Sequence, residues 1–296
     1  KYIIRLKKLC SFKEKKTVLN YSSINSFDPS SKENNDSQNK IRESIIISIV
    51  NNRIPPDYSK YSKRWNNLQQ YVFNYIYTHM VSKEDIVSIS CEPKAGRKYN
   101  YDFDFIINGV VYKVEFKFNA TKIDETPQFN SAMYPSQYMT MKFEEYYYDN
   151  YLPIIASEAN LPIPEKDTYL SQIHSDKPSC MKDFQMLYKS DNSFNKTCKE
   201  EAKKSIEKFM EDVELKTDLL SSYLLESQKN KHYMMFSNNK FYYEQPNMDD
   251  YVIKSYIVDQ KNKNRFICDT KSGKKMKVLL RWKNGNGIAF PAFQIS

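Results

Sequence analysis

Glycine is scarce in this sequence, and the scarcity excludes several kinds of nucleotide site. Only 5 of the 296 residues are Gly, which is too few for repeated Gly-rich phosphate loops or for collagen-like repeats. The Gly-x-Gly-x-x-Gly fingerprint and the Walker loop are both absent. The usual sequence signatures of dinucleotide-binding and nucleoside-triphosphate-binding folds are therefore missing.

Cysteine and histidine are too few and too scattered to indicate a metal site or a nucleophile relay. The 5 cysteines contain no Cys-x-x-Cys pair and their number is odd, which speaks against a zinc ribbon and against a disulfide framework. The 3 histidines lie far apart and give no support to a His-rich metal site or a His-dependent relay. We expect a reducing compartment, and thus an intracellular protein of the cytoplasm or nucleus that is not secreted.

The sequence also lacks any apolar run of the roughly 18 residues that a membrane-spanning helix needs, and we expect no membrane partner.

Hydrophobic residues make up 40% of the chain and aromatic residues 15%, which is enough to bury a sizeable core. Lys and Arg number 45 and Asp and Glu 36, so the net charge is +9. A basic excess of this size favours a polyanionic partner, most often nucleic acid.

The hydrophobic pattern predicts an α/β fold with a mixed central sheet flanked by helices. We divide the chain into an N-terminal segment and linker (1–37), a core (38–244) with a helical insertion at about 152–230, and a β-rich C-terminal subdomain (245–296). Helical spacing predicts helices at 38–51, 63–81, 136–148 and 199–229. Alternation and turn residues predict strands at 86–91, 101–107, 110–118, 233–236, 241–243, 251–258, 265–268, 276–282 and 288–295.

One predicted hairpin holds the motif that carries chemistry. Asn108-Gly109 separates two strand-like runs, and both positions of a tight turn favour positive φ. With a two-residue turn, Asp102 faces Glu115 across the strand pair, with Cβ atoms about 5 Å apart. Lys117 shares the face of Glu115 because side chains alternate along a strand. Two opposed carboxylates destabilise each other unless a cation neutralises them, and Mg²⁺ is a hard cation that takes carboxylate ligands.

An exposed ladder of charges on a half-buried hairpin explains the same spacing. In that interpretation the charged side chains only face solvent, and the alternating Phe and Val side chains pack on the other face. Asp104 also competes with Asp102 for the position opposite Glu115, because a bulge or a longer turn would shift the register. The two-residue turn favours Asp102 over Asp104, and spacing alone does not decide between a metal site and a charge ladder.

The order Asp-x(12)-Glu-x-Lys across a β-hairpin, after a helix and a strand, resembles the core of the PD-(D/E)XK nucleases. That superfamily includes many type II restriction endonucleases and the archaeal Holliday-junction resolvases. The segment Val114–Asn119 is similar to the third core strand of the restriction enzymes. The resemblance covers roughly residues 63–150, and its motif covers 101–119. Tyr101 stands where the family has Pro, and the expected core helix lacks a Glu. Glu43 on the preceding helix is the alternative, although we expect it to be a solvated surface residue.

The resemblance implies a restriction endonuclease-like core and a metal-dependent endonuclease that hydrolyses DNA phosphodiester bonds, sequence-specifically if it is restriction-like. Asp102 and Glu115 would bind Mg²⁺, or Mn²⁺ in its place, together with the Phe116 carbonyl. Asp104 is the alternative metal ligand. Lys117 would position the attacking water and stabilise the charge that develops on the phosphate. No covalent intermediate is needed.

Other residues complete the set of candidates. Gln128, which follows the third strand, would be a further catalytic residue by the same resemblance. Two basic clusters are candidate contacts to nucleic acid. An ordinary solvated loop explains the first equally well, and a plain β-hairpin explains the second somewhat better. The clusters are Lys94, Arg97 and Lys98 before the site strand, and Arg281 and Lys283 near the C-terminus.

Two other functions fit the sequence. One is a non-catalytic nucleic-acid-binding protein on the same fold, whose charged hairpin is only a surface. The other is an endonuclease that cuts RNA. DNA is the partner that we expect first, and the sequence is compatible with a homodimer.

Overall fold

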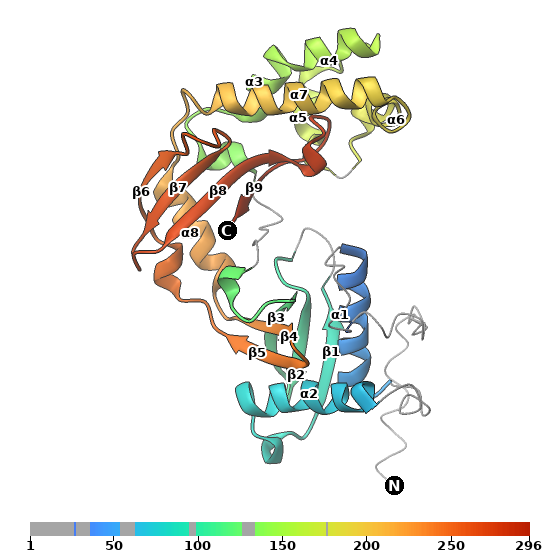
Figure 1. Cartoon of the computed structure of the whole chain (residues 1–296), viewed down its shortest axis with the longest axis vertical. Coiled ribbons are helices and arrows are strands. Elements are labelled where there is room, and N and C mark those ends of the chain that lie inside the picture. The colour runs from blue at the N-terminus through green and yellow to red at the C-terminus, as the bar shows by residue number, and fades with distance from the viewer. Residues whose placement is uncertain (1–26, 28–35, 54–62, 95–98, 126–133, 176) are drawn as a thin grey trace.

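The computed structural model describes residues 27, 36–53, 63–94, 99–125, 134–175 and 177–296. In Figure 1 the chain forms two bodies, a lower one around a five-stranded sheet and an upper one around a four-stranded sheet. Helices flank both sheets, and the second sheet is built from the C-terminal part of the chain. The predicted α/β class is confirmed, with its mixed central sheet, helical insertion and small β-rich C-terminal part.

The first sheet combines parallel and antiparallel pairing, in the order β1-β2-β3-β4-β5. β3 and β4 run parallel, whereas the other neighbours are antiparallel. A parallel pair needs a long crossover connection, and helices α3 to α8 lie between β3 and β4 along the chain. The strands are β1 (Ile89–Pro93), β2 (Phe103–Ile107), β3 (Val110–Phe118), β4 (Lys231–Ser237) and β5 (Lys240–Glu244).

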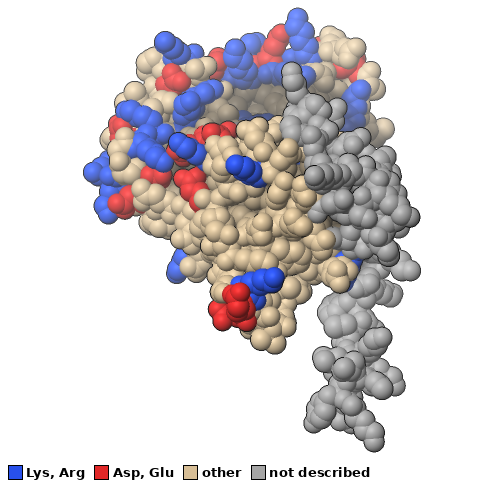
Figure 2. Space-filling model, turned by 60° about the horizontal axis from the view of Figure 1, so that its bottom comes forward, with Lys and Arg blue, Asp and Glu red and all other residues tan. Residues whose placement is uncertain are grey.

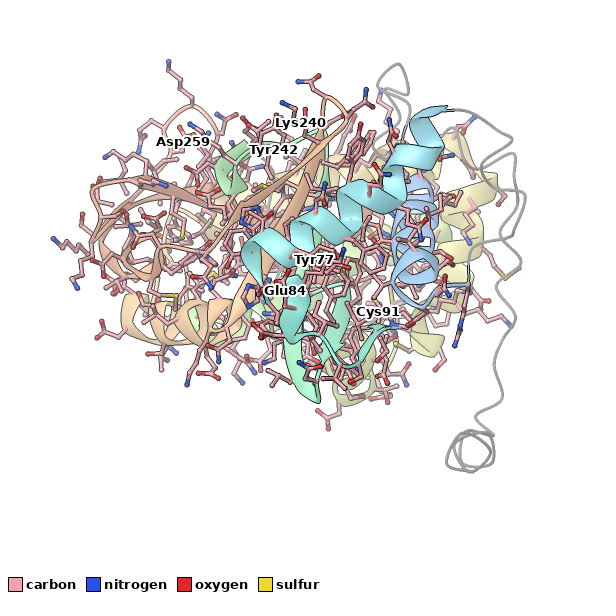
Figure 3. The ribbon with its side chains drawn as sticks, turned by 90° about the horizontal axis from the view of Figure 1, so that it is seen from below. Tyr77, Glu84, Cys91, Lys240, Tyr242 and Asp259 are labelled. Atoms are coloured by element: carbon pink, nitrogen blue, oxygen red, sulfur yellow. The ribbon has the colours of Figure 1, made fainter. Side chains whose placement is uncertain are left out.

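Helices α1 (Asp36–Val50) and α2 (Lys63–His79) cover one face of this sheet. Figure 3 shows α2, marked by Tyr77, lying in front of the strands. Asn51, directly after α1, exchanges two 2.8 Å hydrogen bonds with the backbone of Cys91 in β1. The helices predicted at 38–51 and 63–81 are thus confirmed. The apolar residues that α1 buries at helical spacing include Ile45, Ile46 and Ile49.

The predicted hairpin is confirmed in both its turn and its register. Asn108 and Gly109 have φ angles of 52° and 81°, the left-handed backbone that a two-residue turn of this kind needs. The Asn108 side-chain oxygen accepts hydrogen bonds from the N–H groups of Val87 (2.8 Å) and Ser88 (3.0 Å). These two donors therefore bind the turn, and β1 begins at Ile89, later than predicted.

The second body consists of helices α3 to α8 and an antiparallel sheet of order β6-β7-β8-β9. Helices and sheet share one hydrophobic core. In the part of the chain that the structure describes, no helix is long and apolar enough to cross a bilayer. The elements are α3 (Phe143–Asn150), α4 (Leu152–Ala159), α5 (Lys166–Gln172), α6 (Lys182–Ser190), α7 (Asn192–Phe209), α8 (Thr217–Gln228), β6 (Ile253–Val258), β7 (Arg265–Thr270), β8 (Lys275–Trp282) and β9 (Pro291–Ile295).

The prediction of one long helix over 199–229 is wrong, because the chain forms two helices, α7 and α8, in this region. Residues 210–216 separate them. They begin with a turn at 210–212, and residues 214–216 pair with residues 138–140 through a bridge between Met139 and Leu215. Ahead of α3 the chain forms a 3-10 helix at Pro135–Tyr138 and then the bridge at Met139, so α3 begins later than predicted. Tertiary contact overrides local helix propensity at both places.

Substitution of Trp282 tests whether the helices and the C-terminal sheet depend on one hydrophobic core. Its side chain is 1% exposed, and the centroid of its ring lies 4.6 Å from the centroid of the Tyr147 ring in α3. Trp282→Ala is expected to lower the free energy of unfolding by about 3–5 kcal/mol, because it opens a cavity between helices and sheet. Urea unfolding followed by far-UV circular dichroism measures the change.

Lys277→Ala is the matched control, because Lys277 is exposed on the same strand. It should change the free energy of unfolding by less than about 0.5 kcal/mol. A Trp282→Ala protein as stable as this control would contradict the shared core.

Candidate functional site

The charged side chains of the hairpin lie on the face of the first sheet that is opposite α1 and α2. Successive residues of β3 point to opposite faces. Val114 and Phe116 are buried in the core beneath the helices. Glu115 and Lys117 consequently lie together on the other face, with side chains 13% and 18% exposed.

Asp102 stands directly before β2 and opposite Glu115, as the predicted register requires. Its backbone N–H donates to the Val114 carbonyl at 3.0 Å. Its side-chain Oδ2 accepts the N–H of Phe116 at 2.7 Å. These bonds to the residues on either side of Glu115 hold Asp102 against β3, so the structure brings the two predicted carboxylates together.

Two lysines neutralise this carboxylate pair. The Lys117 Nζ donates a hydrogen bond to Oε1 of Glu115. Lys231, the first residue of β4, places its Nζ 3.6 Å from Oε2 of Glu115. The same Nζ donates to the Asn100 carbonyl at 2.6 Å, and the Lys231 side chain is only 4% exposed. Lys231 is not part of the sequence motif, because the parallel pairing of β3 with β4 brings it to the hairpin.

The pKa values of these groups depend on one another. Burial, together with the charge of Glu115, raises the pKa of Asp102 from its usual 3.8 to about 7. Burial acts to raise the pKa of Glu115 as well, but the charges of Lys117 and Lys231 outweigh it and lower that pKa. The pKa of Lys117 is raised, because the two carboxylates outweigh burial, whereas burial lowers the pKa of Lys231. Burial thus disfavours the charged forms of Asp102 and Lys231 more than their neighbours compensate.

Glu43 of α1 lies near the site, and the expectation that it is a solvated surface residue is wrong. It is half-buried, and its charge contributes to the raised pKa of Lys117. The neighbouring Arg42 places its guanidinium carbon 3.4 Å from the ring centroid of Phe118, which directly follows Lys117. The N-terminal half of α1 therefore flanks the end of β3 that carries the site.

Asp104 lies on the same face but is held by a different cation. Lys94 Nζ is 3.0 Å from Oδ2 of Asp104 and 3.2 Å from Oε2 of Glu92. The hydrogen bond to Asp104 is the main reason that the Lys94 pKa is raised. The structure thus places Asp102 with Glu115, and it places Asp104 with Lys94. Lys94 is engaged with carboxylates rather than presented to solvent as a contact for phosphate.

The other candidates do not gather at this site within the described residues. Arg97, Lys98 and Gln128 lie outside the residues that the structure describes. Arg281, on β8, donates through Nη1 to a glutamine of β9 at 2.7 Å, and Lys283 is exposed in the turn that follows β8. Both belong to the second body. Figure 2 shows the underside of the molecule, where few charged side chains cover the lower body and most gather toward the upper rim.

The donor set suits a hard divalent cation. Asp102 and Glu115 offer carboxylate oxygens on one face, and Mg²⁺ is often bound by one or two carboxylates with water and phosphate oxygens. The raised pKa of Asp102 shows that this buried carboxylate would gain from further positive charge. Among the described residues no group of three or more His, Cys, Asp or Glu could hold a metal. Any metal would thus need ligands beyond protein side chains.

Comparison of the chain with family models, with curated proteins and with solved structures returns no match. The resemblance to the PD-(D/E)XK nucleases therefore rests on the hairpin and its residues. A fold hosts many functions, so function has to be argued from the geometry and charge of the site itself.

Asp102→Asn tests the electrostatics of the metal-free site. Because folding raises the pKa of Asp102 from 3.8 to about 7, ionising this carboxyl destabilises the folded state progressively as the pH rises through that window. The penalty is complete above about pH 7 and absent below about pH 4. The asparagine variant should therefore be more stable than the wild type by on the order of 2 kcal/mol at pH 8, and about equally stable at pH 4.

Chemical denaturation in EDTA at the two pH values measures this difference. Asp104→Asn is the control, because it removes the partner of Lys94 and should be destabilising at pH 8. A stability gain of Asp102→Asn that does not change with pH would show that Asp102 ionises normally in the folded protein.

Proposed function

We propose that this protein is a Mg²⁺-dependent endonuclease that hydrolyses phosphodiester bonds in DNA. The observation that supports this proposal most directly is the convergence of Asp102, Glu115 and Lys117 on one face of the hairpin. The backbone N–H of Phe116 donates a hydrogen bond to the Asp102 carboxylate. This arrangement agrees with the proposed relation to the PD-(D/E)XK nucleases. An intracellular location and a nucleic acid partner belong to the same proposal.

Each site residue has a definite role in this chemistry. A bound Mg²⁺ lowers the pKa of a water ligand and neutralises charge on the scissile phosphate. Asp102 and Glu115 would hold the metal, and the Phe116 N–H keeps the Asp102 carboxylate in place. The Lys117 ammonium would position the attacking water and stabilise the negative charge that develops on the phosphate oxygens. Lys117 donates a hydrogen bond to Glu115 in this structure. Its ammonium group is therefore already next to one of the two carboxylates that would hold the metal.

A non-catalytic nucleic-acid-binding protein on the same fold is the second candidate. The specific observation in its favour is that Lys117 and Lys231 already neutralise the two carboxylates without a metal. In that case the four charges would serve the packing of the sheet, and nucleic acid would bind to basic side chains elsewhere. An RNA endonuclease would use the same residues, and only the substrate distinguishes it.

Plasmid cleavage tests the proposed activity. Supercoiled DNA should be nicked or linearised in the presence of Mg²⁺ or Mn²⁺, and excess EDTA should stop the reaction, because both carboxylate ligands act through the metal. Gel electrophoresis of the plasmid measures the products, and a parallel reaction with single-stranded RNA identifies an RNA endonuclease. Undiminished cleavage in excess EDTA would contradict the metal mechanism.

Lys117→Ala separates catalysis from binding. Removing one donor that acts on the developing charge typically lowers the rate by about 10²–10³, whereas DNA affinity is a sum over many phosphate contacts and should remain nearly unchanged. Initial cleavage rates and electrophoretic mobility shifts measure the two effects. The control is Lys113→Ala, since Lys113 lies on the same strand and face but is exposed.

The two variants should differ clearly in rate. The Lys113 variant is expected to cleave at close to the wild-type rate. If the Lys117 variant also does so, Lys117 is not part of an active site, and the charge ladder becomes the better interpretation of the hairpin.

A further inference from the structure

Lys231 is a site group that the hairpin motif does not contain. It begins β4, pairs in register with Lys113 of β3, and has a side chain that is 4% exposed. Its Nζ donates to the Asn100 carbonyl at 2.6 Å and lies 3.6 Å from Oε2 of Glu115. The backbone therefore fixes this ammonium group beside the carboxylate that the proposed function makes a metal ligand.

The formal charges of Asp102, Glu115, Lys117 and Lys231 sum to zero without a metal when all four groups are ionised. Asp102 and Glu115 bring two negative charges when both are ionised, and Lys117 and Lys231 bring two positive charges. Because the Lys231 ammonium is 3.6 Å from Oε2 of Glu115, a Mg²⁺ ion held by this carboxylate would lie near a positive charge. Like charges at such a separation repel strongly in a buried site, and the site would carry an uncompensated excess of positive charge.

We propose that Lys231 weakens divalent-metal binding in the free protein, so that the metal site is completed only together with a phosphate group of the substrate. This inference rests on the proposed function. The negative phosphate offsets the excess positive charge, and by linkage metal and phosphate raise each other's affinity by the same factor. Lys231 is thus a positioning residue that couples the two ligands, and it need not touch the reacting atoms.

Mn²⁺ binding to the full chain at about pH 8, followed by the electron paramagnetic resonance signal of the free ion, tests the proposal independently of activity. Lys231→Met removes the ammonium group and keeps a side chain of similar length. Lys231→Gln keeps an N–H donor for Asn100. Both variants are expected to bind Mn²⁺ at least about tenfold more tightly than the wild type, because a cation next to the metal is gone.

Lys229→Met is the matched control. Lys229 precedes β4, its side chain is 63% exposed, and it pairs with Glu226 at 3.8 Å. This variant should bind Mn²⁺ as the wild type does. Thymidine 5′-monophosphate, which carries a phosphate but no phosphodiester bond to cut, probes the coupling. It should raise the Mn²⁺ affinity of the wild type several-fold, and that of the Lys231 variants by a smaller factor.

Two results would overturn the proposal. The first would leave the proposed function standing, and the second would contradict it as well. If the folded Lys231 variants, checked by circular dichroism, bind Mn²⁺ no more tightly than the wild type, Lys231 does not control the metal. Metal-dependent cleavage by the wild type would then leave the proposed function standing. If Glu115→Gln leaves Mn²⁺ binding unchanged, the metal does not use this carboxylate, and the proposed function fails together with the inference.

Discussion

The opposition of Asp102 and Glu115 across one strand pair is the constraint on which the first sheet depends. Both carboxylates are largely removed from solvent, and two like charges in that position are unfavourable unless positive charge lies beside them. Lys117 comes from the same strand, but Lys231 comes from β4. The neutral state of the hairpin therefore depends on a strand that the chain reaches only after helices α3 to α8.

That dependence links the site to the second body. The C-terminal end of α8 lies against the site loop, where Asn100 Nδ2 donates to the Ser227 carbonyl at 2.7 Å. Gln228, the last residue of α8, accepts a hydrogen bond at Oε1 from the hydroxyl of Tyr233 in β4 at 2.8 Å. Asn100 is also the residue whose carbonyl accepts the Lys231 ammonium. Polar contacts from α8 and β4 thus hold Asn100, which lies two residues before Asp102. A displacement of α8 would therefore shift the backbone that positions the carboxylate pair.

The sequence predicts contacts between residues that are close along the chain, and it does not predict contacts between residues that are far apart. Asn108-Gly109 determines the turn, and the turn determines the register that puts Asp102 opposite Glu115. Lys231 lies 131 positions from the Asn100 carbonyl that it binds, and no periodicity indicates such a contact. The break between α7 and α8 has the same origin, because Leu215 pairs with Met139 in a distant segment. Helical spacing continues through 210–216 and does not indicate the turn and the long-range pairing that separate the two helices.

Stability alone is a weak reason for this set of charges. Replacing buried ion pairs with apolar side chains of similar volume is often neutral or stabilising, and the neighbouring residues of the same face, Tyr233 and Met235, are fully buried without charge. A sheet that needed only packing could therefore place apolar side chains at positions 102, 115, 117 and 231. The raised pKa of Asp102 shows that the two lysines compensate this carboxylate less fully than they compensate Glu115. We favour chemistry over packing because buried, mutually perturbed charges are typical of functional sites, whereas packing of the sheet does not require them.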